Sequence, residues 1–236
     1  MKYFIFSDLH GNQYVIDSLK KALNYYKPET VVFLGDVFGY YYGYRKCIEF
    51  LNEISAICLM GNHDNYAMRI LLGDFSLLPF VVSKYGNSYN KILDDRSFCL
   101  NYLIKLKKSY NTQCNGTKIF FTHGSITDPL EGRVYQNTSI NLIDFRGNDI
   151  VFSGHTHHKF IRVIEGKLWV NVGSSGQPRD GQLPIFVLFN SQSGLIQFNN
   201  IQFNKDSLIL ELLNNDDFKL PHSSILNRLP PYESIK

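Results

Sequence analysis

The fold of this chain is decided by its first strand-like segment, residues 2–11, KYFIFSDLHG. Its almost continuous apolar character is typical of a strand buried on both faces, and it ends in an acid and a histidine beside a glycine. Similar short runs follow at 31–34 and 56–60, separated by segments with the apolar spacing of helices at about 13–26 and 44–54. This alternation predicts parallel strands joined by helices.

The rest of the chain has a different pattern. Residues 62–108 show no strand-like alternation, and their apolar spacing predicts a helical insert. Strand-like runs return at 117–121 and 149–153. Four more runs then follow without helices between them, at 160–164, 167–172, 184–190 and 195–203. Their succession predicts an antiparallel meander, and we expect two mixed sheets packed face to face, with helices outside, in a single domain spanning residues 1–236.

Composition excludes several classes of protein. A chain of 236 residues with 44% apolar side chains can bury a core without disulfides or lipid. The net charge of +3 is diffuse, with its densest run at Lys105, Lys107 and Lys108, so no dedicated nucleic-acid groove is indicated. The four cysteines form no C-x-x-C pair, which favours a reducing compartment. The first apolar run breaks at Asp8, too early for a signal peptide or spanning helix, so we expect a cytoplasmic protein with no membrane partner.

Five strand-like runs end in side chains that can bind metal, each next to a glycine. The five motifs are Asp8-Leu9-His10-Gly11, Gly35-Asp36, Gly61-Asn62-His63-Asp64, His123-Gly124 and Gly154-His155-Thr156-His157. In open α/β sheets, functional groups gather at the carboxyl ends of the strands, where glycine lets the backbone turn sharply. We therefore expect the five motifs to share one cleft.

The spacing within the motifs suggests how their side chains are directed. The acid and histidine of the first motif, and the two histidines of the last, are two residues apart, which places them on one side of an extended chain. Asn62 and His63 are neighbours and should face different ways, one toward a metal and the other toward a substrate. Taken alone, most of these motifs are more typical of a helix cap or a turn, and Gly154-His155-Thr156-His157 is the strongest of them, so it is their ordered recurrence that favours a site.

The donor types indicate the kind of metal. Without His63, the motifs supply two carboxylates, one amide oxygen and four imidazoles. Such oxygen and nitrogen donors suit manganese, iron, zinc, cobalt or nickel better than calcium or copper(I). Seven donors are too many for one tetrahedral ion and suit two ions that share a bridging carboxylate.

In their order, these motifs resemble the signature of the calcineurin-like metallophosphoesterase superfamily, which reads D-x-H, G-D, G-N-H-[DE], H and G-H-x-H. Further segments at 35–40, 122–125 and 171–181 are similar to a small, single-domain branch from bacteria and archaea, as is the tail at 220–229. The resemblance covers nearly the whole chain. It implies an α/β fold of four layers, an αββα sandwich of two mixed β-sheets flanked by helices.

The resemblance also implies a role for each motif residue. It assigns Asp8, His10 and His157 to one divalent ion, Asn62, His123 and His155 to a second, and Asp36 to both, with manganese favoured. His63 would be the proton donor, supported by Asp64. In this scheme, two ions about 3.5 to 4 Å apart activate a shared hydroxide, which attacks phosphorus in line with the leaving oxygen.

Departures from the family pattern bear on the substrate. Ser/Thr protein phosphatases carry G-D-x-x-D-R-G and N-H-E, whereas here Asp36 is followed by VFGY and the triplet ends in Asp64, which disfavours protein phosphatase activity. Arg179 is a candidate for binding substrate phosphate, although a pair with Asp180 is an equal alternative. The tyrosines within 40–44 either stack on a substrate base or pack the loop.

We therefore expect a phosphoesterase that depends on two metal ions and hydrolyses phosphodiesters or phosphomonoesters, with a small or nucleotide-like phosphorylated partner as substrate. A scaffold of the same fold that has lost catalysis is one alternative, and the presence of His63 with all seven ligand types argues against it. A protein phosphatase or bis-nucleoside-tetraphosphate hydrolase is another, because the core chemistry is shared.

Overall fold

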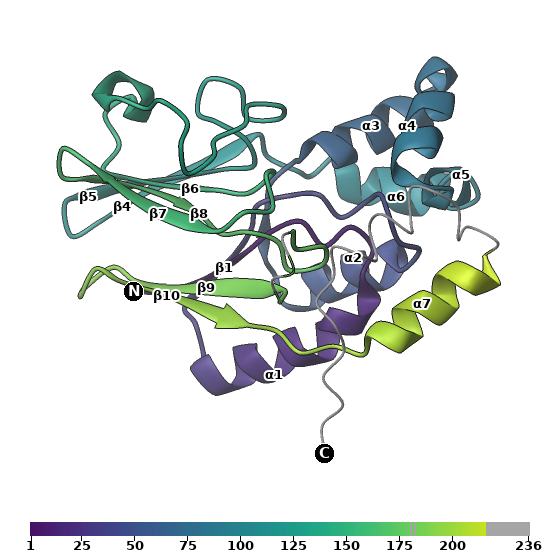
Figure 1. Ribbon diagram of the computed structural model, residues 1–236, viewed down its shortest axis with the longest axis horizontal. Coiled ribbons are helices and arrows are strands. Elements are labelled where there is room, and N and C mark those ends of the chain that lie inside the picture. The colour runs from purple at the N-terminus through teal and green to yellow at the C-terminus, as the bar shows by residue number, and fades with distance from the viewer. Residues whose placement is uncertain (180, 182, 216–236) are drawn as a thin grey trace.

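The computed structural model describes residues 1–179, 181 and 183–215, which form two five-stranded sheets packed face to face (Figure 1). The first sheet has the order β10-β9-β1-β2-β3. Its strands are β1 (Lys2–Phe6), β2 (Thr30–Phe33), β3 (Ile57–Cys58), β9 (Ile185–Asn190) and β10 (Leu195–Asn200). β1, β2 and β3 are parallel, as the alternating pattern predicts, while β9 and β10 are antiparallel.

The second sheet has the order β4-β5-β6-β8-β7. Its strands are β4 (Ser109–Cys114), β5 (Thr117–Thr122), β6 (Ile150–Ser153), β7 (Phe160–Ile164) and β8 (Lys167–Asn171). β5, β6 and β8 are parallel, and the two edge strands are antiparallel. The expected α/β fold with two mixed sheets is confirmed. The expected meander is wrong, because β7 and β8 form a hairpin in this sheet while β9 and β10 form one in the other.

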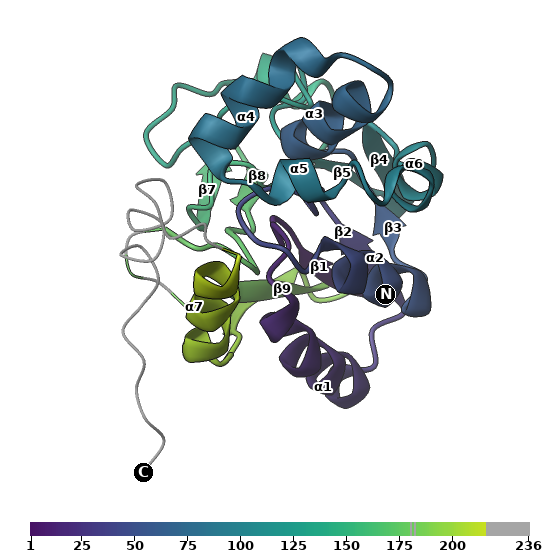
Figure 2. The same ribbon diagram turned by 90° about the vertical axis from the view of Figure 1, so that its right-hand side faces the viewer.

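Helices cover the outer face of the first sheet and one end of the sandwich. On the face lie α1 (Ile16–Tyr26), preceded by the 3-10 helix η1 (Gln13–Val15), α2 (Tyr44–Glu53) and α7 (Lys205–Asn214). At the end gather α3 (Asn62–Leu71), η2 (Phe75–Leu77), α4 (Leu78–Tyr85), α5 (Ser88–Lys91) and α6 (Arg96–Leu103) (Figure 2). Among the described residues, no helix combines the length and apolarity needed to cross a membrane.

The apolar character of β1 follows from its burial on both faces. Tyr3 and Ile5 pack into the core between the sheets, and Phe4 and Phe6 pack into the core beneath the helices. Side chains alternate across a strand, so a strand between two cores needs apolar residues at every position. This burial fixes the strand whose end carries the first motif.

The outer face of the second sheet is covered mainly by the segment 123–149. This segment contains the 3-10 helix η3 (Leu142–Phe145), and it packs over a small core that includes Trp169 and Phe145. The indole Nε1 of Trp169 donates a hydrogen bond to Ser153 Oγ at 3.0 Å. The layer on this side of the sandwich is therefore a structured loop with a short helix.

Two elements, β4 and α7, were not predicted from the sequence. β4 is the polar edge strand SYNTQC, whose side chains are at most half-buried, so it shows no apolar run. α7 begins at the N-cap Asn204, whose side chain accepts hydrogen bonds from Asp206 N and Ser207 N. The tail similarity at 220–229 lies outside the described residues.

Phe152 offers a test of the core between the sheets. Its ring is fully buried, stacked on Phe121 with centroids 5.3 Å apart and tilted against Phe189 at the same distance. We expect Phe152→Ala to lower the free energy of unfolding by about 3–5 kcal/mol, because it removes apolar contact and leaves a cavity. Urea denaturation measures this loss, with Phe75→Ala at an exposed position as control. A loss below about 1 kcal/mol would contradict this view of the core.

Candidate metal centre

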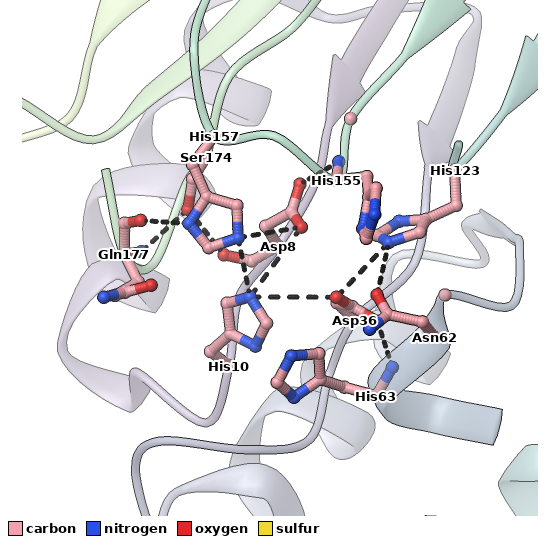
Figure 3. A network of polar contacts seen from close by, with 12 residues as sticks. Asp8, His10, Asp36, Asn62, His63, His123, His155, His157, Ser174 and Gln177 are labelled. Atoms are coloured by element: carbon pink, nitrogen blue, oxygen red, sulfur yellow. Dashed lines mark hydrogen bonds and ion pairs between the residues drawn. The ribbon is translucent and has the colours of Figure 1, made fainter. Parts of the chain in front are cut away.

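The five motifs meet at the carboxyl ends of strands from both sheets (Figure 3). The first two follow β1 and β2, the third opens α3 after β3, and the last two follow β5 and β6. All nine candidate residues are at least nine-tenths buried: Asp8, His10, Asp36, Asn62, His63, Asp64, His123, His155 and His157. The sequence prediction that they share one place in the fold is therefore met.

The backbone of this site is bent in an unusual way. Five of its residues have positive φ values between 50° and 67°: Asp8, His10, Asp36, His155 and His157. The left-handed region costs roughly 1–2 kcal/mol for a residue with a Cβ, and such strain gathers at functional sites. The extended-chain geometry assumed from the i, i+2 spacing is thus wrong. Sharp turns direct these side chains, and they are held by bonds such as Asp8 N to Gly35 O at 2.9 Å and His10 N to Asp36 O at 3.0 Å.

One group of donors consists of Asp8, His10 and His157, whose ligand atoms lie within 4.8 Å of one another. The Nε2 atoms of His10 and His157 are 3.0 Å apart. Asp8 Oδ1 lies 3.3 Å from His157 Nε2 and 3.7 Å from His10 Nε2. These are the residues that the resemblance assigns to one ion.

A second group consists of Asp36, His123 and His155, again within 4.8 Å. Asp36 Oδ2 lies 3.3 Å from His123 Nε2, and Asn62 Oδ1 lies 3.1 Å from the same nitrogen. Asp36 Oδ2 is also 3.8 Å from His10 Nε2 in the first group. Asp36 therefore stands between the two groups, where a bridging ligand would be needed.

Backbone carbonyls orient three of the imidazoles. A carbonyl oxygen only accepts hydrogen bonds, so the ring nitrogen that faces it must carry the proton. In a neutral ring, the other nitrogen then has a lone pair for a metal, which is the usual support for ligating histidines. The three bonds are His10 Nδ1 to Phe38 O at 2.9 Å, His123 Nδ1 to Leu34 O at 3.2 Å and His157 Nδ1 to Gln177 O at 2.6 Å.

The first group fits a cation for a specific reason. Its two Nε2 lone pairs face each other, and Asp8 Oδ1 is buried with no hydrogen-bond partner among the described residues. Lone pairs and an anionic oxygen crowded in a buried pocket repel one another unless a positive charge lies between them. Burial lowers the pKa of His10 well below its ordinary value, and His157 lowers it further, so that ring is neutral. Imidazole and carboxylate donors of this kind suit a divalent transition metal.

The second group shows where a proton can replace such a cation. Burial alone would lower the pKa of His123, but the carboxylate of Asp36, with smaller effects of Asp8 and Asp64, raises it to about 9. Burial also raises the pKa of Asp36, which His123 only partly offsets. Without a metal, a proton on His123 Nε2 thus stabilises the Asp36 carboxylate, and a bound metal would take its place.

Asn62 and His63 are directed by a helix and not by an extended strand. They are the first two residues of α3, and successive residues of a helix point about 100° apart. His63 N donates to Asp36 Oδ1 at 2.8 Å. The His63 ring lies among tyrosines, with centroids 4.2 Å from Tyr85 and 5.4 Å from Tyr40. Its ligand atom also lies within 4.8 Å of those of His10 and Asp36.

The structure places Asp64 away from the role expected for it. Its carboxylate accepts hydrogen bonds from three backbone amides, Asp36 N and Val37 N at 2.8 Å and Gly61 N at 2.9 Å. Burial and the neighbouring Asp36 raise the pKa of Asp64 to about 7. Asp64 thus ties the second motif to the start of α3. The hydrogen bond to the His63 imidazole comes from Tyr89 instead.

Two arginines lie beside the groups of donors. Arg133, which the sequence analysis missed, is exposed and donates from Nε to His155 Nε2 at 3.2 Å. It belongs to the segment 123–149, which has no periodic pattern to mark it. Arg179 is half-buried, and its Nε has no hydrogen-bond partner among the described residues. Burial lowers the pKa of His157, and the charge of Arg179 lowers it further. The alternative partner Asp180 lies outside the described residues.

The tyrosine cluster at 40–44 is largely packing. Tyr41 and Tyr44 are buried in the core beneath the helices. Tyr40 is also buried, with its ring edge-on to His10 at a centroid distance of 4.7 Å. Of the two interpretations, loop packing describes these three rings, and Tyr40 additionally forms part of the wall of the site.

Comparisons with known proteins bear on the family and the fold of this chain. Residues 1–194 match the family described as the calcineurin-like phosphoesterase superfamily domain. An uncharacterised protein of Methanocaldococcus jannaschii is 26% identical, over 97% of this chain and 93% of its own. The crystal structure of a metallophosphoesterase from Sphaerobacter thermophilus has a TM-score of 0.75 at 21% identity, covering 97% of this chain and 98% of that one. A hypothetical protein from Pyrococcus horikoshii has a TM-score of 0.78 at 12% identity, covering 95% and 97%.

The resemblance drawn from the ordered motifs is therefore confirmed. The family match spans all five motifs, from Asp8 to His157. The structural similarities extend over both sheets and show the fold. This chain belongs to the calcineurin-like phosphoesterase superfamily.

Proposed function

We propose that this protein hydrolyses phosphodiester or phosphomonoester bonds of a small or nucleotide-like substrate with the aid of two divalent metal ions, manganese being favoured. The observation that carries this proposal is the pair of buried donor groups joined by Asp36, with His63 beside them. A structural ion alone would need neither two groups nor an adjacent histidine outside the expected ligand set.

The seven candidate ligands divide as the family pattern implies. Asp8, His10 and His157 would hold one ion, Asn62, His123 and His155 the second, and Asp36 both. Two such ions supply Lewis-acid activation of water and neutralise the charge of a phosphoryl group. The carbonyl bonds to Nδ1 orient the rings of His10, His123 and His157 for this ligation, and on His123 a metal would take the place of the Nε2 proton.

His63 would donate a proton to the leaving oxygen. Its ring lies next to the donor groups, and its backbone N–H is bonded to the Asp36 carboxylate, so acid and bridging ligand keep a fixed relation. Charge that builds on a leaving oxygen is stabilised by a positioned acid, which contributes typically 100 to 10,000-fold.

The two arginines would bind the anionic substrate, one beside each group of donors. Arg133 lies at His155 in the second group, and Arg179 acts electrostatically on His157 in the first. Burial raises the pKa of Tyr85 to about 12, and the charges of both arginines oppose this rise, so both charges reach the ring of Tyr85 beside His63. A guanidinium can take two phosphate oxygens at once, which suits a phosphate bound across both donor groups.

Metal dependence separates this function from the scaffold alternative. We expect bis(4-nitrophenyl) phosphate or 4-nitrophenyl phosphate to be hydrolysed with Mn²⁺ and not after treatment with a chelator. Nitrophenolate release measures both. Absence of turnover with manganese, iron, zinc, cobalt or nickel would favour a scaffold. Rates on a phosphopeptide and a dinucleoside polyphosphate test the remaining alternatives.

Asp36→Asn tests the bridging role. The amide keeps the size of the side chain but loses the negative charge between the two groups, so we expect metal content to fall from about two ions per chain to one or fewer. Elemental analysis after dialysis measures it, with Asp144→Asn in the 3-10 helix η3 as control. Unchanged stoichiometry would argue against the shared carboxylate.

His63→Ala tests the acid. We expect metal content to be retained, while the rate on esters with poor leaving groups falls about 100 to 10,000-fold. Nitrophenyl esters need less protonation and should lose less. The comparison of kcat between phenyl and 4-nitrophenyl esters measures this difference, and equal losses on both would remove His63 from the role of acid.

A further inference from the structure

His63 has a hydrogen-bond partner that comes from the helical insert. The hydroxyl of Tyr89, in α5, lies 2.9 Å from His63 Nδ1. Both residues are buried, with 1% of the surface of Tyr89 and 4% of that of His63 exposed. We propose that Tyr89 is a positioning residue that holds the His63 ring by Nδ1, so that Nε2 is the nitrogen presented to the substrate. This inference rests on the proposed function of His63.

No carboxylate takes this place among the described residues. The candidate expected from the sequence, Asp64, uses both oxygens on the backbone amides of Gly61, Asp36 and Val37. A tyrosine differs from a carboxylate because its hydroxyl both donates and accepts. The pairing with Nδ1 can therefore persist whether that nitrogen carries a hydrogen or a lone pair.

The hydroxyl has a second acceptor that makes this exchange possible. Tyr89 Oη also lies 3.4 Å from the backbone oxygen of His63. When Nδ1 is bare, the hydroxyl donates to it across the shorter contact. When Nδ1 carries a hydrogen, the ring donates to Tyr89 Oη and the hydroxyl hydrogen turns to the carbonyl. In both arrangements the ring stays held by Nδ1.

The backbone at Gly39 leaves room for this pair. Gly39 has a φ of +90°, and a Cβ there would lie 2.3 Å from His63 Nδ1 and 3.2 Å from Tyr89 Oη. A side chain at this position would push the imidazole off its partner. Only glycine adopts this φ without strain and also allows so close an approach.

Two further rings fix the plane of the imidazole. Tyr85 and Tyr40 pack against His63, and Tyr40 N donates to Tyr85 O at 3.1 Å, which ties the two walls together. Ring packing limits tilting but does not distinguish Nδ1 from Nε2. The hydrogen bond of Tyr89 supplies that distinction. Burial raises the pKa of Tyr89 well above 10, so its hydroxyl stays protonated.

Tyr89→Phe removes the hydroxyl and keeps the ring. Because a misplaced acid loses catalysis without losing substrate binding, we expect kcat on phenyl esters to fall about 10 to 100-fold with little change in KM. The effect should be small on 4-nitrophenyl esters. In a His63→Ala background, Tyr89→Phe should have no further effect, since its action passes through His63. Independent, multiplying losses in the double variant would overturn the proposal.

A matched control is Tyr44→Phe, which also removes a buried tyrosine hydroxyl, one that donates to Asp95 Oδ2 at 2.7 Å. Both variants should lower the melting temperature to a similar extent, while only Tyr89→Phe changes the leaving-group dependence. An equal effect of both on that dependence would mean that general destabilisation is responsible.

A measurement without metal or substrate tests the same contact. In the metal-free, ¹⁵N-histidine-labelled protein, two-bond proton–nitrogen spectra report the hydrogen-bonding state of each ring, and His63→Ala identifies the His63 signals. We expect Tyr89→Phe to shift the Nδ1 resonance of His63, with Tyr44→Phe leaving it unchanged. Identical His63 signals in the wild type and Tyr89→Phe would overturn the proposal even if hydrolysis is found. If the wild type hydrolyses nothing, the proposed function fails, and this spectrum still decides whether Tyr89 holds the ring.

Discussion

The site depends on the buried carboxylate of Asp36. Its Oδ1 accepts the N–H of His63, and its Oδ2 faces His123 from the second sheet and His10 from the first. A carboxylate taken out of water is costly unless hydrogen bonds and positive charge surround it. Loops of both sheets therefore meet around the Asp36 carboxylate. The approach is so close that a Cβ at Gly61 would lie only 2.0 Å from Asp36 Oδ1.

The packed core of the sandwich offsets the strain and the buried charge of this site. Five site residues adopt the left-handed conformation, and their side chains bury charge and lone pairs in a small volume. Such strain persists only where the surroundings over-determine the backbone. Here strands with apolar residues on both faces, such as β1, run directly into the motifs, so the core between the sheets holds the strained turns in place.

The candidate ligands and the side chains that surround them come from different parts of the fold. Loops at strand ends supply six of the seven candidate ligands, and Asn62 comes from the first turn of α3. The insert of helices α3 to α5 supplies His63 and Tyr89, and the loop over the second sheet supplies Arg133. Loops and inserts generally tolerate change more readily than the buried strands that carry the ligands.

The sequence by itself determined the local features: the strands and helices with clear apolar periodicity, the motifs at strand ends, and the types of donor atom that indicate metal. Only the tertiary structure decided the rest. It separated β7–β8 from β9–β10 into different sheets, and it gave the i, i+2 pairs left-handed turns where an extended chain was expected. It also turned Asp64 to backbone amides and brought Tyr89 to His63 and Arg133 to His155. The physical reason is that periodicity and composition record which residues are buried, whereas partners 22 or 26 residues apart are chosen by packing in three dimensions.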